Sequence, residues 1–325
     1  MIVTVSHDAD LKQVKRTLAG MGLWVSPAER KEDGDALLVV QPSSTVVDAR
    51  EIRKVPGVSS VSAPESAHPR VDEQGPVARI GASSVSRDAP ILIAGPCSVE
   101  SPEQIGRIAA ALKERGVRYL RGGAFKPRTS PYAFQGRGPD ALGWLRQAAD
   151  ANGLAVITEV LSERDVSVVA EHAEVLQIGS RNMHNYALLK AVGKASKPVL
   201  LKRSMSATVE EWLLAGEYLL SSGAGSVMFC ERGVRTFDES TRNLLDLGAV
   251  ALLAHVHNLP VIVDPSHGTG RRDLIVPLAR AALAAGAAGV MIEVHDKPEQ
   301  AESDAPQALH PEALAPVLSL LRGAS

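Results

Sequence analysis

Eight short apolar runs follow one another along most of this chain, each bounded by turn signals and separated by helix-like stretches. The runs are Ile91–Ala94, Val117–Leu120, Ala155–Thr158, Val175–Ile178, Pro198–Leu201, Ser226–Phe229, Pro260–Val263 and Gly289–Ile292. Continuous apolar runs suit strands that are buried on both faces of a parallel sheet. Eight strand–helix units over roughly 250 residues are typical of a (β/α)8 TIM barrel. We therefore predict an α/β protein whose residues 90–325 form such a barrel.

The stretches between the runs have the spacing of amphipathic helices. Helices are expected at Pro102–Arg115, Asp140–Asn152, Val209–Ser222, Thr241–His257, Leu274–Ala285 and Glu312–Leu321. The competing fold is a doubly wound open sheet, which often carries a Gly-x-Gly-x-x-Gly turn after its first strand. Because no such turn follows Ile91–Ala94, the barrel is favoured.

The first 65 residues have a different pattern. Strands are expected at Met1–Val5, Leu23–Ser26, Ala36–Val40 and Gly57–Ser62, and helices at Asp10–Met21 and Thr45–Lys54. This β-α-β-β-α-β order predicts a small ferredoxin-like (ACT-like) α+β domain over residues 1–65. Residues 66–89 are rich in Ser, Pro, Gly and charge, and we interpret them as a linker or an irregular arm.

Composition narrows the class of protein. Hydrophobic residues make up 45% of the 325 residues, and the net charge is −2, so no positive excess is available for a nucleic-acid backbone. The longest apolar run, Ala281–Ile292, is too short to span a bilayer. The two cysteines, Cys97 and Cys230, form no disulfide framework. A cytoplasmic protein without nucleic-acid or membrane partners is expected.

Chemically reactive side chains follow all eight runs. The carboxyl ends of barrel strands meet at one face, where the active sites of such barrels form. These residues are Cys97, Arg121, Lys126, Glu159, Arg181, Lys202, Arg203, Glu231, Arg232, Asp264, His267 and Glu293. Each could be structural when considered singly, but as a set they predict an active site at that face.

One subset has the chemistry of metal ligands: Cys97, His267, Glu293 and Asp304. A thiolate, an imidazole and carboxylates together suit one divalent transition metal, and the mixture of soft and hard donors favours Mn²⁺, Fe²⁺, Co²⁺ or Zn²⁺ without choosing among them. Other interpretations stay open on these residues alone. Cys97 could be a small buried hydrophobe, Glu293 a partner in an ion pair, and Asp304 a surface residue.

A second subset consists of five cations: Arg121, Lys126, Arg181, Lys202 and Arg232. Cations on one rim repel each other unless anions lie between them. Those anions could be the internal carboxylates of Glu159, Glu231 and Asp264, which would close a ring of salt bridges. The number of cations favours instead a substrate with more than one anionic group.

The loop after the second run is strongly basic. Residues 121–135 hold Arg121, Lys126 and Arg128 beside the hydroxyls of Thr129 and Ser130, with no acidic residue among them. Paired glycines let backbone approach a ligand closely, and two prolines stiffen the loop. Such a loop is a good receptor for phosphate or carboxylate groups. A solvated surface loop is the alternative.

Several stretches together resemble one family, the 3-deoxy-D-arabino-heptulosonate 7-phosphate (DAHP) synthases, in the type Iβ branch with an N-terminal ferredoxin-like domain. The matching stretches are Ala94–Glu100, Arg121–Tyr132, Gln177–Asn182, Leu201–Arg203, Cys230–Gly233, Asp264–Gly268 and Ile292–His295. The resemblance implies a transferase at the first step of the shikimate pathway, which leads to chorismate and the aromatic amino acids. Such enzymes condense phosphoenolpyruvate with erythrose 4-phosphate and water, and release phosphate.

The resemblance also implies roles for residues. The subset Cys97, His267, Glu293 and Asp304 would bind the metal, and the five cations would hold phosphoenolpyruvate. Arg128, Thr129 and Ser130 would face the aldose phosphate, with Asp264 near its hydroxyls or the metal. The implied catalytic residues are Lys126, Glu159, Lys202 and His267, where Lys126 would stabilise or protonate the developing alkoxide. Glu159 is a candidate to take the proton of the water.

Two alternatives remain. An octulosonate 8-phosphate synthase would use a five-carbon aldose phosphate, but Lys126–Thr129 resembles the four-carbon branch. A non-catalytic amino-acid sensor conflicts with the complete set of site residues. The family's Ser-Asp-Gly is here Ser303-Asp304-Ala305, so the sequence departs from the family in the loop that carries Asp304. The family further implies a homotetramer or homodimer, and Tyr or Phe as feedback inhibitor of the N-terminal domain.

Overall fold

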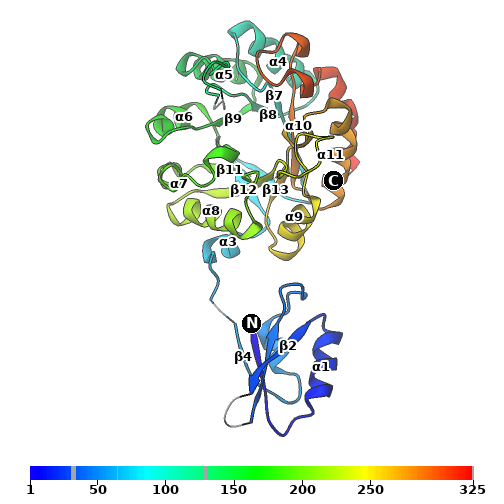
Figure 1. Cartoon of the computed structure of the whole chain (residues 1–325). Coiled ribbons are helices and arrows are strands. Elements are labelled where there is room, and N and C mark those ends of the chain that lie inside the picture. The colour runs from blue at the N-terminus through cyan, green and yellow to red at the C-terminus, as the bar shows by residue number, and fades with distance from the viewer. Residues whose placement is uncertain (31–33, 64, 127–129, 324–325) are drawn as a thin grey trace. The chain divides into compact units, whose positions relative to one another are not determined.

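The computed structural model describes residues 1–30, 34–63, 65–126 and 130–323 (Figure 1). Arg128 and Thr129, both expected at the substrate site, lie outside the described residues. The chain divides into two compact units, Met1–Ala67 and His68–Ser325. Every helix of the described part falls short of the length and apolar character that a membrane-spanning helix needs.

The first unit is a four-stranded antiparallel sheet with two helices. Its elements are β1 (Ile2–Val5), α1 (Leu11–Gly20), β2 (Val25–Arg30), β3 (Ala36–Val40), α2 (Ala49–Arg53) and β4 (Val58–Ser62). The sheet order is β2-β3-β1-β4, and the elements follow one another in the predicted β-α-β-β-α-β order. Val14 and Leu18 of α1 are buried in one core with Leu38 and Ile52. The helix α2 begins later than predicted because Asp48 caps it by accepting from the backbone N–H of Arg50.

The segment expected as a linker is mostly part of the second unit. It contains α3 (Pro69–Gln74), β5 (Ala78–Ile80) and β6 (Ser83–Val85). The side chain of Gln74 donates to the carbonyl of Val227 at 2.9 Å and accepts from its N–H at 2.5 Å. Ala78, Ile80 and Val85 are buried in the core that fills the barrel interior. The β5–β6 hairpin therefore packs against the barrel, and the boundary between the units follows Ala67.

The eight predicted runs are the eight strands of a closed parallel barrel (Figure 1). They are β7 (Ile91–Gly95), β8 (Tyr119–Arg121), β9 (Ala155–Glu159), β10 (Val175–Ile178), β11 (Pro198–Lys202), β12 (Ser226–Glu231), β13 (Val261–Val263) and β14 (Gly289–Glu293). The last strand pairs with the first, from Gly289 opposite Ile91 to Glu293 opposite Gly95. The predicted TIM barrel is confirmed.

Helices surround this barrel. They are α4 (Pro102–Glu114), α5 (Pro139–Asn152), α6 (Val166–His172), α7 (Tyr186–Gly193), α8 (Val209–Ser221), α9 (Leu247–Ala251), α10 (Pro265–Thr269), α11 (Ile275–Ala284) and α12 (Ala315–Gly323). The helix predicted from Thr241 begins only at Leu247, where Asp246 caps it. The preceding residues instead pair with the segment after β13, since Arg242 N–H donates to Thr269 O.

The strands are apolar throughout because each contributes to two cores. Ile93, Leu200, Met228 and Ile262 belong to the core inside the barrel. Their neighbours Leu92, Val199, Val227 and Val261 belong to the larger core under the helices. This double burial explains why the strands read as continuous apolar runs. It also fixes the polar residues at the strand ends, where the candidate site lies.

Candidate active site

A cavity of about 570 Å³ opens at the carboxyl ends of the barrel strands. Its lining includes all five predicted cations, Arg121, Lys126, Arg181, Lys202 and Arg232. Ser130, Glu159, His267 and Asp304 also line it. Side chains from distant parts of the sequence thus converge on one face, as the barrel predicts.

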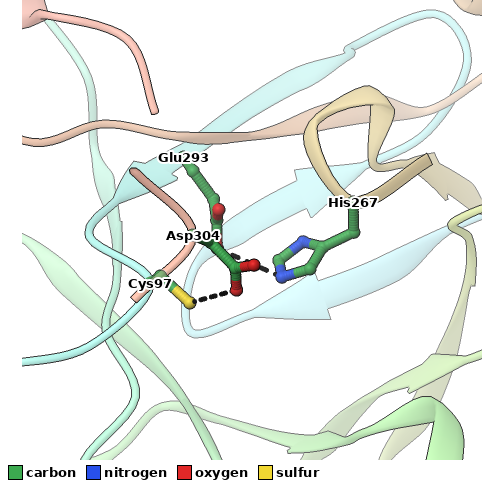
Figure 2. A group of neighbouring side chains, drawn as sticks. All are labelled: Cys97, His267, Glu293 and Asp304. Carbon is green, nitrogen blue, oxygen red and sulfur yellow. Dashed lines mark hydrogen bonds and ion pairs between the residues drawn. The ribbon is translucent and has the colours of Figure 1, made fainter. Parts of the chain in front are cut away.

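The four candidate metal ligands lie close together (Figure 2), and two of them, His267 and Asp304, line this cavity. Cys97, His267, Glu293 and Asp304 each offer a donor atom, and these atoms all lie within 4.8 Å of one another. The Cys97 thiol donates to Oδ2 of Asp304 at 3.0 Å. Nε2 of His267 lies 3.1 Å from Oε1 of Glu293. The donor set of one sulfur, one nitrogen and two carboxylates fits a divalent transition metal.

The backbone around His267 orients its imidazole. The residue sits in α10, whose N-cap Asp264 accepts from the His267 backbone N–H at 2.9 Å. The other carboxylate oxygen of Asp264 contacts Nδ1 of the same histidine at 2.7 Å. A carboxylate on one ring nitrogen fixes the ring and leaves the other nitrogen for a metal. Nε2 is therefore the ligand atom that faces the cluster.

The charges around the cluster favour a bound cation. Burial lowers the pKa of His267, but Asp264 and Glu293 outweigh burial and raise this pKa to about 10. Burial raises the pKa of Glu293, yet His267 and Arg121 hold it well below its usual value. Burial and the nearby Glu293 raise the pKa of Asp304, but His267, the hydrogen bond from Cys97 and Arg242 keep it below its usual value. The carboxylates are thus ionised, and the histidine proton occupies the place where a metal would compensate them.

Two cations, Lys126 and Arg121, contact residues of the cluster. Nζ of Lys126 donates to Sγ of Cys97 at 2.9 Å and to its carbonyl at 3.2 Å. Nη1 of Arg121 donates to Oε1 of Glu293 at 3.0 Å and to the carbonyl of Pro96 at 2.8 Å. Both side chains are buried. Lys126 thus places a positive charge directly beside Cys97.

The remaining rim cations differ in how their hydrogen-bond donors are satisfied. Lys202 donates to Asp264 at 2.5 Å, and Arg203 contacts Glu231 at 3.0 Å and Asp246 at 2.9 Å. Arg232 differs, because its Nη1 is buried and makes no hydrogen bond within the described residues. Burial lowers the pKa of this arginine. A buried guanidinium with an unsatisfied donor on a cavity wall calls for an anionic ligand.

Glu159 is held at the end of β9 by the neighbouring strand. Its Oε2 accepts from Nε2 of Gln177 at 3.3 Å. A Cβ at Gly179 would collide with its Oε1. The carboxylate therefore occupies space that only glycine leaves open, beside the cavity that both Glu159 and Gln177 line.

The sequence reasoning missed several residues at the site. Arg235 and Arg242 add two more cations to the cavity wall, and Gln307 donates to Oε2 of Glu293 at 2.5 Å. Arg242 lies in the stretch Thr241–His257 for which the sequence predicts a helix, and Gln307 lies in an irregular segment without periodic signal. Arg203 and Glu231, which follow predicted strands, pair with each other and are not in the lining.

Comparison with known proteins agrees with this geometry. The model of the DAHP synthetase I family matches residues 76–323. A Thermotoga maritima phospho-2-dehydro-3-deoxyheptonate aldolase is 54% identical over 218 residues, which cover 67% of this chain and 64% of that relative. The chain thus spans slightly less than two thirds of that relative. A Methylobacterium radiotolerans 2-dehydro-3-deoxyphosphooctonate aldolase is 32% identical over 73% of this chain and 90% of its own length.

Solved structures match over more of the chain. The crystal structure of a Thermotoga maritima DAHP synthase superimposes with a TM-score of 0.76 at 39% identity, over 99% of this chain and 96% of that one. A truncated form of the DAHP synthase from the same organism gives 0.70 at 45% identity, over 77% and 91%. With a family model matching most of its length, this chain belongs to the DAHP synthetase I family.

Proposed function

We propose that this protein is a DAHP synthase, which condenses phosphoenolpyruvate with D-erythrose 4-phosphate and water to give DAHP and phosphate. The main support is a cavity lined by cations, which lies beside a cluster of four side chains of the metal-ligand type. Two phosphorylated substrates explain the excess of positive charge. The 54% identity to a heptonate aldolase, against 32% to an octonate aldolase, favours the four-carbon aldose as acceptor.

Different cations would bind different substrates. Arg121, Lys126, Arg181, Lys202 and Arg232 would bind the phosphate and carboxylate of phosphoenolpyruvate, and Arg232 has a buried donor left for this purpose. Ser130 lines the cavity next to the chain segment that carries Arg128 and Thr129. These three residues would bind the phosphate of the aldose. Fixing both anions in one geometry removes much of the entropic barrier to their reaction.

Cys97, His267, Glu293 and Asp304 would hold one divalent metal, whose identity stays open among Mn²⁺, Fe²⁺, Co²⁺ and Zn²⁺. When bound, such a metal supplies Lewis acidity to the aldehyde oxygen. Asp264 keeps Nε2 of His267 aimed at the cluster, and Asp264 lies close to the aldose hydroxyls in this scheme. Lys202, held by the same carboxylate, contributes a positive charge near the reacting atoms.

The condensation then needs one proton donated and one accepted. C3 of phosphoenolpyruvate bonds to the aldehyde carbon, and the aldehyde oxygen takes up a proton. Lys126, whose ammonium lies 2.9 Å from Sγ of Cys97, is placed to donate it. A water adds at C2, and phosphate leaves with its bridging oxygen as the C2–O bond breaks. Glu159 would accept one proton from the water, and the remaining hydroxyl proton goes to the departing phosphate as the C2 carbonyl forms.

The test is release of inorganic phosphate by the full-length chain after metal removal and reconstitution. Phosphate should appear only when phosphoenolpyruvate, erythrose 4-phosphate and a divalent metal are all present. Arabinose 5-phosphate in place of the four-carbon aldose should react far more slowly. Faster reaction with the five-carbon aldose would identify an octulosonate 8-phosphate synthase, and no reaction with either would favour a sensor.

The first unit completes the proposal. Met1–Ala67 would bind Tyr or Phe as feedback inhibitor, and the chain would act in the cytoplasm as a homotetramer or homodimer. The support is the resemblance to the type Iβ branch together with the β2-β3-β1-β4 sheet of this unit. Sedimentation of the purified chain tests the oligomeric state, and phosphate release with and without each amino acid tests the inhibition.

A further inference from the structure

The fourth candidate ligand, Asp304, is positioned differently from the other three. Glu293 ends β14, Cys97 follows β7 by two residues, and His267 lies in α10. Asp304 comes instead from the long segment between β14 and α12, which contains only short 3-10 turns. Its φ is +53°, in the left-handed region that non-glycine residues rarely adopt. Such a conformation persists where surrounding contacts hold it.

Most contacts to this segment hold its backbone or its neighbours. Ser98 and Ser303 share a hydrogen bond of 2.6 Å. Arg272 donates to the carbonyls of Ala305 and Pro306. These interactions hold the segment in place but do not touch the carboxylate of Asp304.

Arg242 does touch that carboxylate. Its Nη2 donates to Oδ1 of Asp304 at 2.9 Å, while Oδ2 accepts from the Cys97 thiol (Figure 2). A metal-binding cysteine is a thiolate, which has no hydrogen to donate to Asp304. In that state the hydrogen bond from Cys97 is lost, and Oδ2 of Asp304 is available to the metal. The contact from Arg242 remains available to hold Oδ1.

The backbone of Arg242 is itself attached to the segment that carries His267. Its N–H donates to Thr269 O at 2.9 Å, and the next residue, Asn243, donates to Gly268 O at 2.9 Å. A Cβ at Gly270 would come within 3.2 Å of the Arg242 side chain, so this side chain crosses directly over the end of α10. Arg242 therefore connects the segments of two candidate ligands.

We propose that Arg242 is a positioning residue for the metal: it holds the Asp304 carboxylate in ligand geometry and couples it to the His267 helix. The inference rests on the proposed metal site and assigns a role to a residue outside the four ligands. A salt bridge of similar exposure, Arg137 to Glu302 at 2.9 Å, lies on the same segment and provides a matched control. Arg137 is 45% exposed and Arg242 is 42%.

The test measures Co²⁺ affinity of the full-length, metal-stripped chain by competition with a chelator of known affinity. R242Q should bind Co²⁺ about 10- to 100-fold more weakly than the wild type, the usual loss when an outer-shell partner is removed. R242K keeps the charge without the planar fork and should fall between them. R137Q should bind as the wild type does.

Four outcomes separate the possibilities. Weaker Co²⁺ binding by R242Q and R242K, with R137Q unchanged and circular dichroism alike in all variants, supports the proposal. Equal affinity in wild type and R242Q overturns it. An increased KM for the phosphorylated substrates with unchanged Co²⁺ affinity also overturns it, since Arg242 would then bind substrate. A wild-type chain that binds no Co²⁺ would instead refute the metal site itself.

Discussion

At the scale of single residues, adjacent cations on this rim have opposite electrostatic roles. Arg203 contacts two carboxylates, Glu231 and Asp246. Arg232 directly follows the next strand, β12. Its Nη1 is buried and has no hydrogen-bond partner among the described residues. A buried donor without a hydrogen-bond partner costs stability, so its retention points to ligand binding. Paired charges, by contrast, become costly when one partner is removed.

Substituting these two arginines should therefore give opposite results. R232M should raise KM for phosphoenolpyruvate about 10- to 100-fold, since a hydrogen bond to a charged group is worth about 1.5–3 kcal/mol, and should leave the ligand-free chain at least as stable. R203M leaves Glu231 buried and unpaired, and should lower the free energy of unfolding by about 3–5 kcal/mol. Urea denaturation and steady-state kinetics measure both. A destabilised R232M with normal KM would contradict this assignment.

The protonation of His267 predicts a pH dependence of stability. Its pKa is about 10 in the folded chain against 6.5 as the ordinary value, so its stabilisation is complete below pH 6.5 and is lost as pH rises towards 10. The metal-free chain should lose thermal stability over this interval. Bound metal replaces the proton and should flatten the curve.

The measurement is Tm against pH for metal-stripped wild type and H267N, with metal-loaded wild type alongside. H267N should lack the decline that the stripped wild type shows between pH 6.5 and 10. Parallel curves for the two stripped proteins would show that His267 does not carry the effect.

At the scale of elements, the side chain of Glu159 at a strand end fits only because a neighbouring residue is glycine. Gly179 follows β10 and leaves room for the carboxylate of Glu159, which ends β9. Gly143, within α5, has open space where a Cβ would lie. The same substitution should therefore affect function at one glycine and stability at the other.

G179A should displace Glu159 and reduce kcat strongly, because a base moved by about 1 Å can cost 100-fold in rate. G143A should leave kcat unchanged and stabilise the chain by about 0.5–1 kcal/mol, the helix preference of alanine over glycine. Kinetics and thermal denaturation of both variants give the comparison. Normal turnover by a folded G179A would exclude a catalytic role for Glu159.

At the scale of the whole molecule, the segment after the first unit belongs to the barrel. Ala78, Ile80 and Val85 are fully or nearly fully buried in the interior core, and Gln74 pairs with the backbone of Val227. The unit boundary after Ala67 therefore matters for any truncation. A cut at residue 90 would expose the interior core.

A chain that begins at His68 should fold with a barrel as stable as that of the full chain. A chain that begins at Pro90 should lose several kcal/mol, since burial of each Val or Ile side chain contributes about 1.5–3 kcal/mol. Urea denaturation of the two truncations distinguishes them. Equal stability would mean that the β5–β6 hairpin is dispensable.

The chain beginning at His68 also tests regulation. If the first unit binds the inhibitor, any inhibition of the full-length enzyme by Tyr or Phe should be absent from this truncation, while phosphate release continues. Inhibition that persists after truncation would place the amino-acid site in the barrel.

The order of apolar runs determined the barrel and the face on which its chemistry lies. Both follow from local rules: strands buried on two faces are continuously apolar, and strand carboxyl ends meet at one rim. The convergence of Cys97, His267, Glu293 and Asp304 could be anticipated for the same reason, helped by the family resemblance. Their roles as ligands remain a proposal.

Only the tertiary structure decided which charges are paired. Arg203 and Arg232 are alike in sequence position, but distances to Glu231 and Asp246 separate them. The bridge from Arg242 to Asp304 joins residues 62 positions apart, and the hairpin at 78–85 became core rather than linker through contacts with distant strands. Ion pairs and burial depend on the separation of atoms in space, which local periodicity does not encode.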